Sequence, residues 1–221
     1  MRIITGKYKG RHFDIPRTFK ARPTTDFAKE NIFNVLTQYV DFEGATALDL
    51  FSGTGSISLE LLSRGCQQVV SVELDRDHHR FIQECFRKLQ TPSNSPCLGG
   101  ELGSSPKQGR LGGVFIPIRG DVFRFVKTCK QQFDFIFADP PYALKELGTL
   151  PDLIFGTPAS ADSSTKDRSV ASHSSLLTLN SSLLKPSGIF VLEHGKDYDF
   201  SGHPHFVEHR QYGSVNFTLF R

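Results

Sequence analysis

The chain has 221 residues, of which 38% are hydrophobic and 20 are phenylalanine, enough to build the core of one ordinary domain. No stretch approaches the ~20 consecutive apolar residues of a membrane helix, and no apolar signal region opens the chain, so we expect a cytoplasmic protein. The four cysteines lack C-x-x-C spacing, which argues against a zinc site and fits reduced thiols: Cys66, Cys85, Cys97 and Cys129.

The net charge of +3 is concentrated at one end of the chain. Residues 1–30 contain eight lysines or arginines and three acids, a charge of +5 that leaves −2 for the other 191 residues. Such a basic segment attracts polyanions by releasing their counterions, and its interleaved aromatic residues suit stacking on bases. A solvated, lysine-rich surface is the alternative. The candidate contacts to RNA are Lys7, Lys9, Arg11 and Arg22.

The first residues predict a short β-hairpin followed by a helix. Residues 2–5 and 12–15 are strand candidates on either side of Gly6 and Gly10. Apolar residues at helical spacing follow, and Thr25 or Asp26 is a candidate helix cap. We therefore expect residues 1–42 to form a small basic extension of a main domain in residues 43–221.

From residue 45 onward, patterns typical of strands and helices alternate. Strands are predicted at residues 45–51, 68–74, 114–118, 133–138 and 188–193, and helices at residues 56–63, 76–89, 122–130 and 176–184. Two further strands, at residues 205–210 and 214–221, form a closing hairpin. The alternation indicates a Rossmann-like α/β fold whose seven-stranded sheet is mostly parallel, with helices on both faces and an antiparallel C-terminal hairpin. Residues 91–113 and 156–175 lack periodicity and predict surface loops.

Parallel sheets bind ligands at the carboxyl ends of their strands, and polar groups follow several of these ends. Asp49 belongs to the first strand, and the glycine turn after it leads into a helix N-terminus: Phe51-Ser52-Gly53-Thr54-Gly55. Glu73 ends the second strand and suits the two hydroxyls of a ribose. Asp121 follows the third strand, as either a ligand contact or a helix N-cap.

The fourth strand ends in the most informative pattern of the chain, Asp139-Pro140-Pro141-Tyr142. Two consecutive prolines must end the strand, which leaves a carboxylate, a rigid carbonyl and an aromatic ring together. These groups suit the binding of a flat base by its exocyclic amine. A plain turn is the alternative, because proline and aspartate are common in turns.

Two cofactors compete for the glycine turn. The match to the dinucleotide pattern G-x-G-x-x-G is incomplete, because Ser58 stands at the third glycine position. A pyrophosphate gains little from a nearby acid such as Asp49, whereas the ammonium and sulfonium groups of S-adenosylmethionine are attracted to it. The sequence therefore favours S-adenosylmethionine over a nicotinamide cofactor.

These residues resemble the class I S-adenosylmethionine-dependent methyltransferases, and more narrowly the RsmD family of bacterial 16S rRNA guanine-N2 methyltransferases. The matching segments are Arg2-Ile3-Ile4-x-Gly6, Arg22-Pro23-Thr24-Thr25-Asp26, Leu48-Asp49-Leu50-Phe51-Ser52-Gly53-Thr54-Gly55, Val72-Glu73-Leu74-Asp75 and Phe137-x-Asp139-Pro140-Pro141-Tyr142. The resemblance implies methyl transfer to guanine N2 in 16S rRNA of the small ribosomal subunit. It implies that Asp139 and the Pro140 carbonyl accept the amine hydrogens while Tyr142 stacks on the base.

The resemblance also implies how the cofactor is held. Asp49 and the glycine turn would lie along the methionine part, Glu73 on the ribose and Asp121 on the adenine amine. Two alternatives are open for Arg22: it contacts either the RNA backbone or the cofactor carboxylate. We expect no metal, because the one tight histidine group matches no metal motif: His203, His205 and His209. We also expect a monomer.

Other functions remain open at this point. Asp-Pro-Pro-Tyr also occurs in DNA amino-methyltransferases, so an adenine or cytosine amine in DNA, or a protein glutamine amide, is an alternative substrate. A non-catalytic RNA-binding module is a second alternative, and a nicotinamide oxidoreductase is a more distant third.

Overall fold

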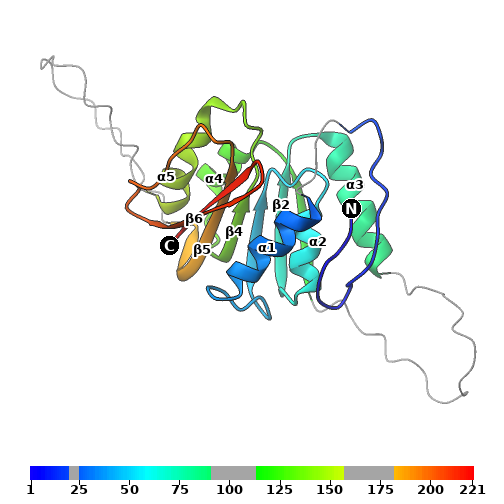
Figure 1. Ribbon diagram of the computed structural model, residues 1–221. Helices are drawn as coiled ribbons and strands as arrows, with labels where there is room; N and C mark the ends of the chain where they lie inside the picture. Colours follow the sequence, from blue (N-terminus) through cyan, green and yellow to red (C-terminus); the bar gives the residue numbers. More distant parts are fainter. Residues whose placement is uncertain (20–24, 91–112, 157–181) are drawn as a thin grey trace, which may run out of the picture.

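The computed structural model describes residues 1–19, 25–90, 113–156 and 182–221 (Figure 1). Arg22, Cys97, most of both predicted loops and residues 176–181 of the last predicted helix lie outside these ranges. Within them, the strands form one sheet in the order β3-β2-β1-β4-β5-β7-β6. The strands are β1 (Thr46–Leu50), β2 (Gln68–Glu73), β3 (Val114–Arg119), β4 (Phe133–Ala138), β5 (Leu184–His194), β6 (Phe206–Tyr212) and β7 (Val215–Phe220).

The pairing of these strands confirms the predicted sheet. Strands β1 to β5 pair in parallel, and β7 pairs antiparallel with both β5 and β6. The α/β fold with a mostly parallel seven-stranded sheet and a closing antiparallel hairpin is therefore the observed architecture.

The helices follow the strands much as the sequence predicts. They are α1 (Asp26–Leu36), α2 (Ser56–Ser63), α3 (Arg76–Gln90), α4 (Val122–Thr128) and α5 (Leu150–Phe155), with a 3₁₀ turn at Lys145–Thr149. The sequence reading did not predict α5 or the 3₁₀ turn, which follow the double proline. The end of the predicted helix 176–184 is wrong, because Leu184 opens β5 and pairs with Phe133 of β4.

The core lies in two layers, one on each face of the sheet. Helices α1, α2 and α3 cover one face, with Phe33, Leu59 and Ile82 fully buried there. Helices α4 and α5 cover the other face, through residues such as Val126 and Ile154. Both faces are buried, which explains why the central strands are nearly continuous apolar runs.

The N-terminal segment forms a short version of the predicted hairpin and packs on α2. Backbone hydrogen bonds join Met1 to Phe13 and Ile3 to Arg11, on either side of an isolated antiparallel bridge between Arg2 and His12. The pairing is shorter than the strands predicted at residues 2–5 and 12–15, because the backbone N–H groups of Ile4 and Thr5 donate to the buried Glu60 carboxylate of α2, at 2.7 and 3.0 Å.

Candidate active site

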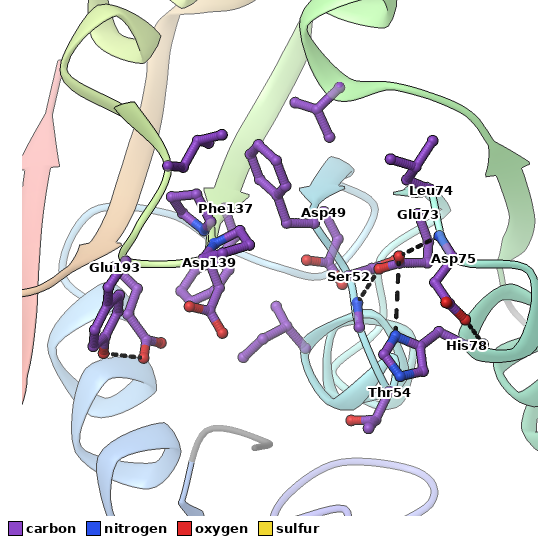
Figure 2. A pocket seen from close by; sticks show the side chains of 18 of the residues that line it. Asp49, Ser52, Thr54, Glu73, Leu74, Asp75, His78, Phe137, Asp139 and Glu193 are labelled. Carbon is purple, nitrogen blue, oxygen red and sulfur yellow. Dashed lines mark hydrogen bonds and ion pairs between the residues drawn. The ribbon is translucent and has the colours of Figure 1, made fainter. Parts of the chain in front are cut away.

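The register of the sheet brings acidic side chains together at the carboxyl ends of the strands. Asp49 is paired with Ser71 on one side and with Phe137 on the other. Because side chains alternate between faces along a strand, the positions two residues further on, Glu73 and Asp139, share that face. These residues line a cleft of about 1440 Å³ at this edge of the sheet (Figure 2).

Glu193 lies beside Asp139 at the same edge. Ala138 pairs with Leu192 between β4 and β5, so the next residues along the two parallel strands, Asp139 and Glu193, are neighbours. Glu193 is only 4% exposed and lines the cleft. From the sequence, a residue at the end of this strand either borders the substrate cleft or is an exposed strand end, and Glu193 is found at the cleft.

The turn after β1 has the unusual backbone that the glycine pattern predicts. Phe51, Gly53 and Gly55 all have positive φ, of 58°, 52° and 75°. A Cβ atom on Gly55 would lie 2.8 Å from the Ile82 side chain, so both space and conformation require glycine there. Gly55 then precedes α2 without a side-chain cap, which leaves the first amides of the helix next to the cleft.

Asp49 is a buried carboxyl with one local partner. Its Oδ2 accepts hydrogen bonds from the Ser58 N–H at 3.0 Å and the Ser58 hydroxyl at 2.5 Å. Burial raises the pKa of Asp49 to about 7, although the Ser58 bonds oppose the rise and the charge of Glu73 adds to it. A nearby cation would therefore stabilise its ionised form.

Glu73 is held in place by backbone amides. One carboxylate oxygen accepts from Gly53 N–H and the other from Asp75 N–H, both at 2.7 Å, and His78 Nδ1 lies 4.0 Å away. Each oxygen keeps a second lone pair, so the carboxylate can still accept two hydroxyl groups. The centroid of the His78 ring lies 4.4 Å from that of the Phe19 ring.

Asp121 caps a helix. Its Oδ1 accepts from Arg124 N–H at 2.8 Å and caps the N-terminus of α4, as one of its two sequence interpretations predicts. The residue also lines the cleft, next to an apolar wall in which the rings of Phe51 and Phe123 meet edge to face at 6.2 Å. Both the N-cap role and a ligand contact through the second oxygen are compatible with this position.

The Asp139-Pro140-Pro141-Tyr142 segment leaves β4 and turns into the cleft. The Pro141 carbonyl accepts from Leu144 N–H at 2.8 Å, whereas no donor in the described ranges reaches the Pro140 carbonyl. The Tyr142 hydroxyl donates to Glu193 Oε1 at 3.3 Å, and the ring remains 48% exposed. The segment thus presents an unused carbonyl, a carboxyl group and an open aromatic face.

The pKa of Asp139 reflects its burial and the neighbouring carboxyl groups at this edge. Asp139 has a small opening to the cleft and is otherwise enclosed by protein. Burial, followed by the charges of Glu193 and Asp49, raises its pKa well above the ordinary value. Such a site favours a cationic ligand and groups that donate hydrogen bonds.

Three of the predicted RNA contacts, Lys7, Lys9 and Arg11, lie away from this cleft. Helix α2 starts at the glycine turn and ends at Ser63, whose carbonyl accepts from Lys7 N–H at 2.7 Å. Lys9 belongs to the same turn, and the Arg11 guanidinium donates to the Lys88 carbonyl near the end of α3. With a helical rise of about 1.5 Å per residue, these three residues lie about 12 Å or more from the turn.

Within residues 1–19, 25–90, 113–156 and 182–221, no group of three or more histidine, cysteine or acidic residues is arranged to hold a metal ion. None of the helices in those ranges is both long enough and apolar enough to cross a bilayer.

The strand order, the reversed β7 and the cleft at the carboxyl edge define a class I S-adenosylmethionine-dependent methyltransferase. Solved structures share this fold. The putative methyltransferase yhhF from Escherichia coli matches with a TM-score of 0.69 and 20% identity, over 100% of this chain and 96% of that one. The 16S rRNA N2 methyltransferase RsmC from T. thermophilus, in complex with AdoMet and guanosine, matches with a TM-score of 0.57 and 14% identity, over 92% of this chain and 44% of that one.

Sequence comparison gives the family. The family model described as Conserved hypothetical protein 95 matches residues 1–154. The putative rRNA methyltransferase YlbH from Bacillus subtilis is 35% identical over 70% of this chain and 73% of its own length. Ribosomal RNA small subunit methyltransferase D from Haemophilus influenzae is 32% identical over 64% of each chain. The protein belongs to this family, the RsmD family of S-adenosylmethionine-dependent methyltransferases.

Proposed function

We propose that this protein transfers a methyl group from S-adenosylmethionine to the exocyclic N2 amine of a guanine in 16S rRNA of the small ribosomal subunit. The observation that carries the proposal is the segment after β4, where the Asp139 carboxyl and the unused Pro140 carbonyl stand at the edge of an acidic cleft. The relatives named as rRNA methyltransferases support the same substrate class.

The residues of the cleft fit the cofactor. Asp49 suits a positively charged methionine portion. The backbone of the glycine turn lines the cleft beside it, through Phe51, Ser52, Gly53 and Thr54, and the first turn of α2 follows Gly55. Glu73 has the two free lone pairs that a ribose requires. Asp121 borders the apolar wall suited to an adenine.

The chemistry required of the protein is activation of a weak nucleophile. When bound, S-adenosylmethionine supplies a methyl group that its sulfonium already activates. The lone pair of a guanine amine is delocalised into the ring, so two acceptors that fix its hydrogens favour a more reactive geometry. Asp139 and the Pro140 carbonyl provide these acceptors, and the exposed face of Tyr142 positions the base.

The proton balance assigns a second role to Asp139. As the new N–CH₃ bond forms and the S–CH₃ bond breaks, the amine must lose one proton. Because burial and neighbouring acids raise the pKa of Asp139, its carboxylate is a better proton acceptor than an exposed one, and water then carries the proton away.

Binding of the RNA would involve the basic N-terminal extension, residues 1–42, in addition to the catalytic domain, residues 43–221. Lys7, Lys9 and Arg11 would bind phosphates at a distance from the target base, and Arg22 would bind either the RNA backbone or the cofactor carboxylate. Phosphate contacts position an enzyme but do not select a base. The protein would act as a monomer in the cytoplasm, where ribosomal subunits assemble.

A methyl-transfer assay tests the proposal. Purified protein with tritiated S-adenosylmethionine is incubated separately with unmodified 16S rRNA, small subunits, DNA and a protein extract, and labelled nucleosides are separated after digestion. We expect label in N2-methylguanosine from 16S rRNA or small subunits. Label in DNA or protein with none in rRNA would contradict the proposal and favour an alternative amine substrate.

A further inference from the structure

Glu193 is the acidic group of the cleft to which the proposed reaction assigns no role. It is 4% exposed, lies next to Asp139 across the β4–β5 pair and faces the same cleft. The Tyr142 hydroxyl donates to Glu193 Oε1 at 3.3 Å, and one of the dashed lines in Figure 2 ends at the labelled Glu193 carboxylate. Because Glu193 and Asp139 both line the cleft, a ligand that donates hydrogen bonds is the kind that this pair of carboxyl groups favours.

Guanine offers donors with this arrangement. Its N1–H and its N2 amine are adjacent on one edge of the ring, so two neighbouring carboxyl groups can accept from them together. Adenine and 2-aminopurine have a lone pair at N1 instead of a hydrogen. If either of these bases were bound, a carboxylate facing N1 would face a second hydrogen-bond acceptor and could not form a hydrogen bond there.

Tyr142 connects the plane of the base to this edge. Its exposed ring is the stacking surface of the proposed reaction, and its hydroxyl fixes one oxygen of Glu193. The ring also packs near Gly195, where a Cβ atom would lie 3.6 Å from it. A base stacked on this ring therefore turns its edge toward the carboxyl groups that the ring helps to orient.

We propose that Glu193 accepts the N1–H of the target guanine and thereby selects guanine over bases with an acceptor at N1. This inference rests on the proposed function and adds a substrate-reading residue to it. A site built to bind an N–H group rejects analogues that lack it, because its own buried polar group is then left unpaired.

The test compares RNA substrates that carry guanine or 2-aminopurine at the target position. Both bases have the 2-amine, but only guanine has N1–H. We expect the wild-type kcat/KM to favour guanine by roughly 10²-fold or more. Glu193→Gln replaces an acceptor oxygen with an amide N–H₂ group that can donate to N1 of 2-aminopurine. The ratio of kcat/KM for guanine to that for 2-aminopurine should therefore fall at least about tenfold, the effect expected for loss of one hydrogen bond to a charged group.

Two controls separate this role from a structural one. Glu146→Gln removes the same charge from an exposed residue that also lines the cleft, and it should leave the preference unchanged. Calorimetric binding of S-adenosylmethionine shows that Glu193→Gln is folded. An unchanged preference in folded Glu193→Gln would overturn the inference.

The wild-type protein alone also tests the inference. If Glu193→Gln fails to fold, equal wild-type activity on guanine and 2-aminopurine overturns the inference, and a strong preference for guanine supports it. A wild-type protein that methylates neither base in rRNA instead contradicts the proposed function, so the two failures are distinguishable.

Discussion

At the residue scale, the cleft uses carboxyl groups whose surroundings differ. Glu73 is fixed by two backbone amides, Asp49 is buried against Ser58, and Asp139 stands at the open edge beside Glu193. The same functional group, a carboxyl, therefore serves three expected purposes: binding hydroxyls, attracting a cation and accepting amine hydrogens. The neighbours of each group determine which purpose it suits.

Asp139→Ala should abolish methyl transfer while leaving the cofactor bound. The substitution removes an amine acceptor and the nearest proton acceptor, so we expect kcat to fall by roughly 10²-fold or more, the loss typical for one preorganised polar group. The Kd for S-adenosylmethionine, measured by calorimetry, should change little. Asp139→Asn keeps an acceptor oxygen and should retain more activity; full activity in the alanine variant would exclude this role.

The raised pKa of Asp49 predicts an unusual pH dependence for the protein without cofactor. The native carboxyl keeps its proton up to a pH of about 7, whereas the unfolded one has the ordinary value of 3.8. Between these values the native state binds more protons, so the free energy of unfolding should decrease as the pH rises. Urea unfolding at pH 5 and pH 7.5 measures the change.

Asp49→Asn supplies the control for that experiment. It cannot ionise, so its free energy of unfolding should decrease less over the same interval. Affinity for the cationic cofactor should follow the opposite trend in the wild type and increase as Asp49 ionises. Identical pH profiles for the wild type and the asparagine variant would show that Asp49 is not the titrating group.

Residues that end a predicted strand were accessible from the sequence alone. Glu73 and Asp139 close or follow an apolar run, Asp49 lies one residue before the end of another strand, and the parallel sheet then brings all three to one edge. Glu193 was harder to assign, because its importance depends on the β4–β5 register and on the Tyr142 hydroxyl, neither of which a single sequence specifies.

At the scale of elements, α2 connects the N-terminal segment to the cofactor turn. Its first residue, Ser56, accepts from the buried Lys29 ammonium at 3.0 Å, and Lys29 also donates to the Arg2 carbonyl. Halfway along the helix, Glu60 accepts from Ile4, Thr5 and Arg64. Residues 2–5 are thus linked to α2 by hydrogen bonds at the start of the helix and at its middle.

Glu60→Ala should strongly destabilise the protein. It leaves two backbone N–H groups and the Arg64 guanidinium without their buried acceptor, and breaking a buried charge pair costs ~3–5 kcal/mol. Urea unfolding gives the free energy directly. Glu30→Ala, on the exposed face of α1, should change it by less than about 0.5 kcal/mol. Equal effects of the two substitutions would contradict the role of Glu60.

Elements were predicted well wherever the hydrophobic pattern set both type and length. Helix α2 was predicted with its observed bounds, and β4 likewise. The N-terminal hairpin is shorter than predicted, because the amides of Ile4 and Thr5 bind Glu60 of α2, which the hydrophobic pattern could not show. The short α5 was missed because six residues after a proline-rich turn carry too little helical periodicity.

At the scale of the whole molecule, three of the predicted RNA contacts and the cleft occupy different places. Lys7, Lys9 and Arg11 lie toward the C-terminal ends of α2 and α3, whereas the cleft lies at the N-terminal ends of the same helices. The sequence showed that the segment is basic but gave no information on its distance from the cleft. A substrate that contacts both must be large, which agrees with an rRNA.

Replacing Lys7, Lys9 and Arg11 together with glutamine should weaken RNA binding without affecting the cofactor. Each lost phosphate contact should reduce the slope of log K against log[salt] by roughly one. Filter binding at several salt concentrations measures this slope. Removing the same charge at the scattered, exposed Arg80, Arg124 and Lys130 should have a smaller effect; equal slopes for the wild type and the first variant would exclude this segment as the RNA contact.

Nucleoside mass spectrometry of 16S rRNA from cells that lack this protein tests the central claim most directly. We predict the loss of one N2-methylguanosine, which a wild-type copy restores and an Asp139→Ala copy does not. An unchanged amount of N2-methylguanosine in the 16S rRNA of those cells would contradict the assignment.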